Sequence, residues 1–249
     1  AIGEAYRCIA GGFADAIIAG GAEASIHPLA VGGFMNSKAL SRSEDPKTAS
    51  TPFDINRSGF VMAEGAGVIV LEEYEHAITR GAHIYAELVG IGLTADAYHL
   101  TASDPEGTGV KNAMLLALRD AGIAAQQVDY INAHGTATPL GDVAEVKAIK
   151  DVFGEHAYDM NITSSKSMLG HVMGAAGAVE SIISILSMQN SVVTPTINHE
   201  EGDEDANIDY KLNYTFNHAQ ERNIQFAMSN NYGFGGQNAC LLFKKNNNQ

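Results

Sequence analysis

The protein has 249 residues, of which 45% are hydrophobic and 18% charged, a composition typical of a folded globular chain with a sizeable core. Its net charge of −14 argues against nucleic acid as the main partner, because phosphate binding needs a basic face. No apolar run reaches the roughly 18 residues of a membrane span, and no leader-like segment opens the chain. The two cysteines, Cys8 and Cys240, are predicted to be buried structural thiols in the reducing cytoplasm, without a metal framework.

The first third of the chain mixes helical and strand patterns. Residues 1–10 have helical spacing, and because the chain opens inside this helix without an initiator Met, we expect a further segment upstream. Residues 15–21 and 66–71 read as buried strands. The stretch 32–60 is turn-rich, and a helix is predicted over 72–80.

The remaining two thirds alternate strands with helices. The pattern predicts strands over 84–93, 128–132 and 161–164, helices over 110–121, 142–153 and 174–188, and two strands from 227 onward around a glycine turn. Such alternation predicts an α/β fold with largely buried sheets. We place the boundary between two structural halves near 81–85, which gives the halves 1–84 and 85–249.

Two histidines stand in glycine-flanked turns after apolar runs, His134 before Gly135 and His171 after Gly170. A lone histidine of this kind is more often structural. Catalytic groups in α/β folds, however, sit where strands end. A neutral imidazole both donates and accepts a hydrogen bond, so two rings that face one cavity are able to bind a carbonyl or enolate oxygen. We expect the helix after His171 to lower the pKa of that ring through its dipole.

Three further features accompany the histidines. Lys166 is either an ordinary surface lysine or a residue that tunes the charge of the site. Glu180 lies among small apolar residues and is predicted to be buried, so it needs Lys166 or a cation as its partner. The segment 233–236 is either a tight turn or a loop that carries a gating Phe234 and offers N–H groups to an oxyanion. No G-x-G-x-x-G opens a helix and no P-loop is present, so we expect no nucleotide cofactor.

The motifs of this chain, in their order and spacing, resemble the β-ketoacyl-acyl-carrier-protein synthases, above all the type II, elongating enzymes of bacterial fatty acid synthesis. The resemblance covers all 249 residues and rests on the segments 19–24, 52–54, 57–60, 71–77, 132–139, 166–171, 174–180 and 233–238. It implies the thiolase fold, with two similar halves layered α-β-α-β-α. This chain would hold the end of the first half and the whole second half.

The resemblance implies a decarboxylative Claisen condensation of malonyl-acyl carrier protein with an enzyme-bound acyl thioester, giving 3-oxoacyl-acyl carrier protein. The cysteine nucleophile would lie a few residues before Ala1, so we expect this chain alone to be inactive in condensation. No cofactor is implied beyond the phosphopantetheine of the carrier protein and a structural monovalent cation. The implied partners are acyl carrier protein, the missing N-terminal segment and a second copy in a homodimer.

The family's roles transfer onto matching positions. His134 and His171 would bind the malonyl thioester carbonyl and stabilise the enolate, beside the active-site Lys166. The remaining implied site residues are the gating Phe234, Thr136 and Thr138 for the phosphopantetheine arm, Phe34 in the acyl pocket, Lys38 near the carrier protein, Gly235 and Gly236 in the substrate loop, and Asn132, Glu180, Ser229 and Asn230 around the cation. Because the carrier protein is acidic, a local basic patch must dock it, with Lys38, Arg42 and Arg57 as candidates.

Two other interpretations remain. A non-catalytic, chain-length-factor-like subunit need not keep His134, His171 and Lys166, which argues against that reading. A thiolase would carry a cysteine in the C-terminal glycine loop, near Gln237. In this loop Gln237 replaces a commoner threonine and Tyr232 a commoner phenylalanine, and both departures leave the fine geometry of the loop open.

Overall fold

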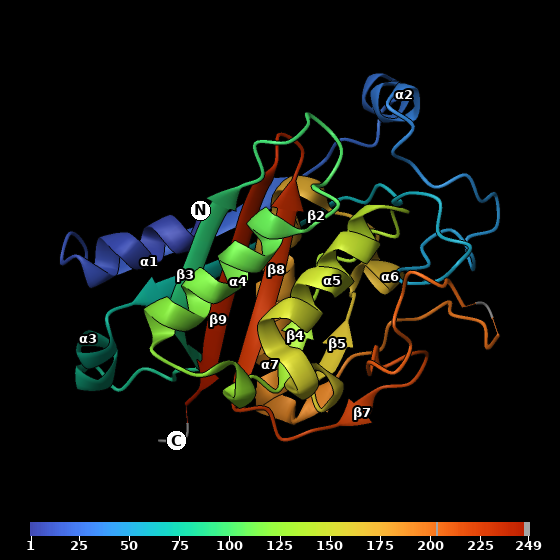
Figure 1. Ribbon diagram of the computed structural model, residues 1–249. Coiled ribbons are helices and arrows are strands. Elements are labelled where there is room, and N and C mark those ends of the chain that lie inside the picture. The colour runs from blue at the N-terminus through green and yellow to red at the C-terminus, as the bar shows by residue number, and fades with distance from the viewer. Residues whose placement is uncertain (203, 247–249) are drawn as a thin grey trace.

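The computed structural model describes residues 1–202 and 204–246 (Figure 1). Its helices are α1 (Ile2–Ala10), α2 (Pro28–Asn36), α3 (Tyr74–Thr79), α4 (Thr108–Ala121), α5 (Gly141–Phe153), α6 (Lys166–Leu169) and α7 (Ala176–Asn190). Its strands are β1 (Ala16–Glu23), β2 (Gly65–Glu72), β3 (Ala86–Ala95), β4 (Tyr130–Asn132), β5 (Asn161–Thr163), β6 (Val192–Val193), β7 (Gln220–Glu221), β8 (Phe226–Gly233) and β9 (Gln237–Lys245). Within the described part, no helix has the length and apolar character needed to cross a membrane.

The larger sheet contains five strands in the order β3-β9-β8-β4-β5. Strand β9 is antiparallel to both of its neighbours, β3 and β8. Strand β4 lies between β8 and β5 and is parallel to both, so the C-terminal ends of these three strands meet at one edge. All residues of β4 and β5 are buried, as expected for strands that are covered on both faces.

Helices separate this sheet from a second, smaller one. Helices α4 and α5 lie over one face of the large sheet, and α1 and α7 lie behind it (Figure 1). On their other side, α1 and α7 contact the antiparallel pair β1 and β2. The result is four successive layers, α-β-α-β, of the predicted layered α/β fold. The outer face of the small sheet exposes Ile18, Val68 and Val70, at 76%, 58% and 64%.

The structure confirms most predicted elements and corrects one segment and one prediction of burial. Strands β1 and β2 form where strands were predicted, but most of their residues are exposed or half-buried rather than buried, because their outer face is uncovered. Helix α2 forms where the sequence predicted turns, because Pro28 opens it and Nδ1 of His27 accepts a hydrogen bond from the N–H of Ala30 at 3.4 Å. The start of the stretch 32–60, predicted to be turn-rich, is thus helical as far as Asn36. The prediction of buried cysteines is half wrong. Cys240 is buried, which raises the pKa of its thiol, whereas Cys8 is exposed.

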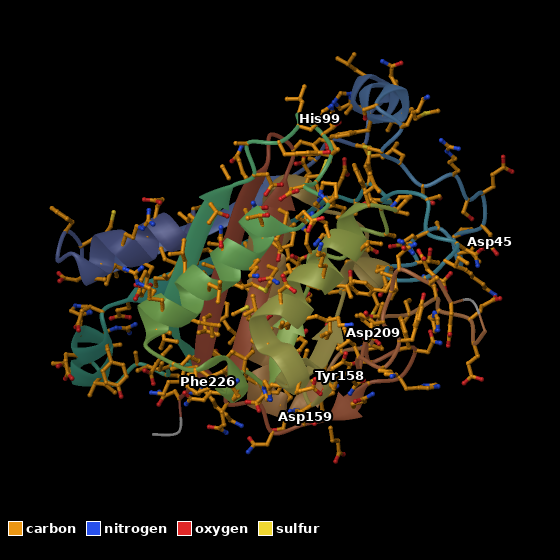
Figure 2. The ribbon with its side chains drawn as sticks, viewed as in Figure 1. Asp45, His99, Tyr158, Asp159, Asp209 and Phe226 are labelled. Atoms are coloured by element: carbon orange, nitrogen blue, oxygen red, sulfur yellow. The ribbon has the colours of Figure 1, made fainter. Side chains whose placement is uncertain are left out.

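Residues 194–219 connect β6 to β7. This connection packs against the end of α5 and against the segment around Arg57. Tyr158 donates a hydrogen bond to Asp209 at 2.9 Å at the lower edge of the molecule (Figure 2). Arg57 is only 6% exposed, and its guanidinium donates to Asp205 at 2.6 Å and to the carbonyl of Pro139 at 3.0 Å. The expectation that Arg57 belongs to a docking patch is therefore wrong, because its charge is already engaged inside the protein.

Candidate active site

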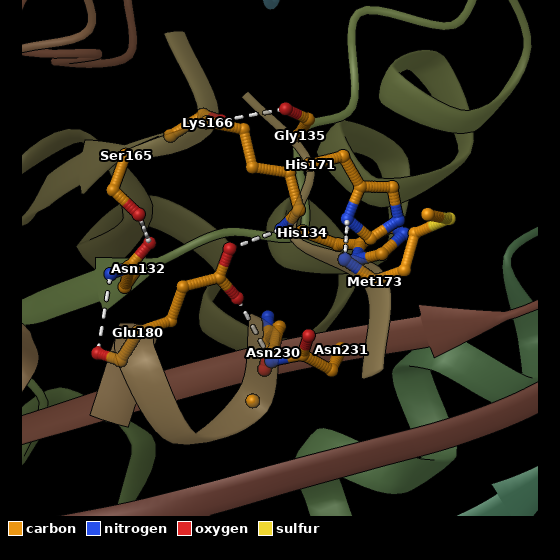
Figure 3. A network of polar contacts seen from close by, with 12 residues as sticks. Asn132, His134, Gly135, Ser165, Lys166, His171, Met173, Glu180, Asn230 and Asn231 are labelled. Atoms are coloured by element: carbon orange, nitrogen blue, oxygen red, sulfur yellow. Dashed lines mark hydrogen bonds and ion pairs between the residues drawn. The ribbon is translucent and has the colours of Figure 1, made fainter. Parts of the chain in front are cut away.

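The predicted site residues come together where the parallel strands end (Figure 3). His134 lies on the loop that leaves β4. Lys166 opens α6 directly after β5, and His171 follows α6. Phe234 lies in the turn between β8 and β9, and Glu180 enters from α7. Residues as many as 100 positions apart in sequence, such as His134 and Phe234, thus share one edge of the sheet, as expected for an α/β fold.

The two imidazoles face each other edge to plane. Their ring centroids are 5.5 Å apart, with an interplanar angle of 87°. Phe60 packs edge-on against His171 at 5.1 Å, and Tyr232 lies 5.2 Å from His134. The aromatic neighbours limit the motion of both rings and keep most of the surrounding water away.

The backbone and the ring of His171 are both held in place. Its N–H donates to the carbonyl of Val61 at 2.7 Å, and its own carbonyl accepts from Ala63 at 3.1 Å. Ring atom Nδ1 accepts the N–H of Met173 at 3.3 Å, so Nε2 carries the proton of the neutral ring. Burial, and then the charge of Lys166, lower the pKa of His171 to about 3. The expected direction is confirmed, but the cause is burial rather than a helix dipole.

His134 is neutral for similar reasons. Burial lowers its pKa well below the ordinary value, and the charges of Lys166 and His171 add to the effect. Part of the ring surface stays open, but atom Nδ1 is enclosed and has no hydrogen-bond partner in the described residues. Two neutral rings next to a lysine can donate hydrogen bonds to a developing anion without adding a formal charge.

The predicted partnership of Lys166 and Glu180 is confirmed. Nζ of Lys166 bonds to Oε1 of Glu180, and the two side chains are 2% and 3% exposed. Oε2 of Glu180 accepts from Nδ2 of Asn231 at 3.0 Å. Burial raises the pKa of the Glu180 carboxyl, and the nearby ammonium acts in the opposite direction. Each of the two buried charges therefore faces an opposite charge, and both carboxylate oxygens of Glu180 are hydrogen-bonded, which is the condition for tolerating a buried carboxylate.

Sequence reasoning missed two buried carboxylates on α5. Oε1 and Oε2 of Glu145 accept the N–H groups of His134 and Gly135, at 2.9 and 2.8 Å. Oδ2 of Asp142 accepts the N–H of Phe53 at 2.8 Å, and burial raises the pKa of Asp142 to about 7. The signal was available, because both acids stand beside apolar residues on one face of a helix, as Glu180 does on α7.

The predicted substrate-binding residues lie around the histidines. Oγ1 of Thr136 is 3.1 Å from Oγ1 of Thr138, directly after His134. The Phe34 ring lies 6.3 Å from that of Phe234, which is 45% exposed. Lys38, next to α2, is exposed. The roles assigned to these residues stay predictions.

The glycine loop is already bonded within the protein. The N–H of Gly235 donates to the carbonyl of Leu100 at 2.7 Å, and that of Gly236 donates to Gly233 at 3.0 Å. Asp96 closes the loop from the other side, because its N–H donates to the Gly236 carbonyl at 2.8 Å. These two glycine N–H groups are therefore not free to bind an oxyanion in this conformation.

The four predicted cation ligands are neighbours, and two of them have a free oxygen. Oγ of Ser229 and Oδ1 of Asn230 are buried and unpartnered within the described part of the chain. Oδ1 of Asn132 accepts from Ser165 at 3.3 Å, and the carbonyl of Glu180 accepts from Asn132 at 3.4 Å. In residues 1–202 and 204–246, no three His, Cys, Asp or Glu side chains are placed to hold a metal ion.

Solved structures share this architecture. A β-ketoacyl synthase from Burkholderia phymatum STM815 superimposes with a TM-score of 0.92 at 42% identity over 99% of this chain and 58% of that chain. A ketosynthase in complex with its type II polyketide acyl-carrier protein gives a TM-score of 0.94 at 40% identity over 99% of this chain and 60% of that chain. The fold and the site therefore place the chain in the class of thiolase-like ketosynthases.

The sequence comparisons narrow the class to a family. Residues 1–77 match "Beta-ketoacyl synthase, N-terminal domain", and residues 85–200 match "Beta-ketoacyl synthase, C-terminal domain". The chain is 52% identical to 3-oxoacyl-acyl-carrier-protein synthase 2 of Staphylococcus aureus (strain COL) and 50% identical to the protein of that name from Coxiella burnetii, in each case over 98% of its own length. The chain belongs to the β-ketoacyl synthase family. It spans 58% of the length of these two relatives.

Proposed function

We propose that this chain is the malonyl-decarboxylating part of a 3-oxoacyl-acyl-carrier-protein synthase that elongates fatty acids. The observation that carries the proposal is the pair of neutral imidazoles, His134 and His171, set edge to plane with 5.5 Å between centroids. Both lie beside the buried Lys166–Glu180 pair, at the edge of the large sheet where the parallel strands β8, β4 and β5 have their C-terminal ends. The names of the two bacterial relatives, and the similarity of the motifs, support the substrate class.

In the proposed reaction the thioester carbonyl of malonyl-acyl carrier protein lies between the two rings. The bond between the α-carbon and the carboxylate breaks, CO2 leaves, and the electron pair forms an enolate whose oxygen accepts hydrogen bonds from the imidazoles. The enolate carbon then attacks the carbonyl of an acyl thioester, and the thiolate that carried the acyl group leaves. Neutral donors suit this step because burial makes each hydrogen bond to the enolate stronger than it is in water.

The thiolate is assigned to a cysteine outside these 249 residues. Cys240 is enclosed in β9 with a raised pKa, which opposes thiolate formation. Cys8 lies exposed on α1, away from the histidines. We therefore expect this chain alone to form no condensation product, and we expect the complete enzyme to be a cytoplasmic homodimer.

The proposed contacts with the carrier protein lie near the aromatic residues Phe34 and Phe234. Thr136 and Thr138 are proposed to bind the phosphopantetheine arm, with Phe34 in the acyl pocket and Phe234 as its gate. Lys38 and Arg42 are exposed and able to meet the acidic carrier protein. The carrier protein bound to the polyketide ketosynthase supports this kind of partner.

A structural monovalent cation is part of the proposal. The unpartnered Oγ of Ser229 fits such an ion on the α7 side of the sheet, with further oxygens from Asn132 and Glu180. The Asn230 side chain bonds to Met114 and Glu145 on the opposite face, so it does not complete this set. The fit is partial, because the carboxylate oxygens of Glu180 are already bonded to Lys166 and Asn231. A cation here would neutralise partial charge and hold β8 against α7.

The test is His134→Ala in the complete enzyme, with CO2 release from malonyl-acyl carrier protein as the readout. We expect a loss on the order of 100-fold, as for removal of an oxyanion donor. An unchanged rate would remove His134 from the proposed role. The alternative, a non-catalytic chain-length-factor-like subunit, predicts no CO2 release from the wild-type protein, and the presence of both histidines and Lys166 argues against it.

A further inference from the structure

Ser164 connects the segment of His134 with the segment of Lys166. This serine is completely buried between β5 and α6, two residues before Lys166. Its Oγ donates a hydrogen bond to the carbonyl of Gly135 at 2.6 Å. Its N–H donates to Oγ1 of Thr196 at 3.0 Å, and its carbonyl accepts from Oγ of Ser167 at 2.9 Å. Every polar group of Ser164 is therefore engaged.

The turn after His134 is held from two sides. Glu145 accepts the N–H groups of His134 and Gly135, while Ser164 binds the carbonyl of Gly135. Gly135 has φ +34, and a Cβ atom at this position would lie 2.7 Å from Cβ of Ser164 and 3.1 Å from the Phe53 ring. Only glycine allows the turn to approach the serine this closely. The hydroxyl and the close packing together fix where this turn lies.

We propose that Ser164 is a positioning residue that sets the place of the His134 imidazole relative to the Lys166 ammonium. The proposal rests on the proposed function, since it assigns His134 the enolate. Ser164 contacts the peptide that follows His134 rather than the ring, so it acts through that peptide. Glu145 anchors the same turn to α5. Before His134, the N–H of Ala133 donates to the carbonyl of Thr163 at 2.7 Å, and after it Ser164 holds Gly135, so the segment that carries Lys166 grips the backbone on both sides of His134.

Removing the hydroxyl has two consequences. The carbonyl of Gly135 loses its partner in a buried place, and the turn is free to shift away from α6. Because His134 directly precedes Gly135, a shift of this turn moves the imidazole relative to His171 and Lys166 and misplaces its hydrogen bond to the enolate oxygen.

The experiment compares Ser164→Ala with a matched control, Ser181→Ala, in the complete synthase. Ser181 is also completely buried, and within the described residues its Oγ bonds to the carbonyl of Gly177 in its own helix. CO2 release from malonyl-acyl carrier protein is followed at one neutral pH. We expect Ser164→Ala to lower kcat roughly 10-fold with little change in KM, because losing about 1.4 kcal/mol of transition-state stabilisation lowers the rate tenfold. Ser164→Cys, which keeps a weaker donor, should recover part of this rate, whereas Ser181→Ala keeps the wild-type kcat.

A wild-type kcat in Ser164→Ala overturns the proposal, as does an equal loss in Ser181→Ala or a Ser164→Cys variant that is no more active than Ser164→Ala. Should the alanine variant not fold, Ser164→Cys replaces it, and a wild-type kcat in that variant overturns the proposal. A wild-type enzyme that releases no CO2 refutes the proposed function instead. Positioning is then read at neutral pH from the NMR signal of the His134 ring, where a displaced signal in the variant supports the proposal and an unchanged one overturns it.

Discussion

Glu145→Gln is the substitution for which the structure makes the sharpest prediction. Both carboxylate oxygens of Glu145 accept a backbone N–H, from His134 at 2.9 Å and from Gly135 at 2.8 Å. Glutamine has the same shape but only one oxygen. Its NH2 group would face one of these two N–H donors, so one backbone donor loses its acceptor in a residue that is 1% exposed.

The magnitude follows from the two groups involved. A hydrogen bond to a charged group contributes about 1.5–3 kcal/mol, and a buried unsatisfied donor costs about 1–3 kcal/mol. The two ranges are not added, because the lost hydrogen bond and the unsatisfied donor are partly the same effect. We therefore expect the free energy of unfolding to fall by about 2–4 kcal/mol. The turn that carries His134 should also loosen, so malonyl decarboxylation should fall with stability.

Asp142→Asn is the matched control, because Asp142 lies one turn earlier on the same helix. Its Oδ2 accepts from Phe53 at 2.8 Å, whereas Oδ1 has no partner in the described residues. An asparagine can keep the first oxygen in place and put its NH2 where the free oxygen was. Urea unfolding of the complete enzyme at pH 7 should show no loss of stability for this variant, because asparagine also removes a buried carboxyl whose pKa is raised to about 7. Equal losses for the two variants would refute the argument from carboxylate geometry.

Three more outcomes are expected. Burial raises the pKa of Asp142 in the folded protein to about 7. The free energy of unfolding should therefore fall as the pH rises from about 4 to about 7, by up to about 1.4 kcal/mol per pH unit. Urea unfolding of Asp142→Asn should show a smaller slope with pH. Lys166→Met should cost about 3–5 kcal/mol of unfolding free energy by leaving the Glu180 carboxylate unpaired, and adding Glu180→Met should recover most of the loss. In the native protein, a thiol reagent should modify Cys8 rapidly and Cys240 only after unfolding, so equal rates would contradict the burial described here.

Much of the fold could be predicted from the sequence because the segments with a strong hydrophobic period are long. The helices near 110–121 and 142–153 and the strands around the glycine turn have clear apolar patterns, and the structure has them within a few residues. Helix α2 was not predicted because its two glycines lower helix propensity. The helix forms because Pro28 and His27 at its start favour a helix N-terminus. The two-residue strands β6 and β7 are too short to give any period.

The site was predictable where a residue type stood out locally. His134, His171 and Lys166 were found from turns and glycines, and the partner of Glu180 followed from the cost of burying a charge. Glu145 and Ser164 were not found from the sequence. Each contributes through a contact with Gly135, in the turn after His134, and Gly135 lies 10 positions from Glu145 and 29 from Ser164. Contacts of this kind depend on how β4, β5 and α5 pack, which no local pattern reports.

The small sheet has a consequence for handling the protein. β1 and β2 pair only with each other in the described residues, so both outer edges carry open N–H and C=O groups, next to an apolar outer face. Such edges are templates for pairing between molecules. The net charge of −14 opposes this by mutual repulsion, which dissolved salt screens. Raising the ionic strength should therefore favour edge-to-edge association of isolated copies of this chain, a shift that light scattering measures.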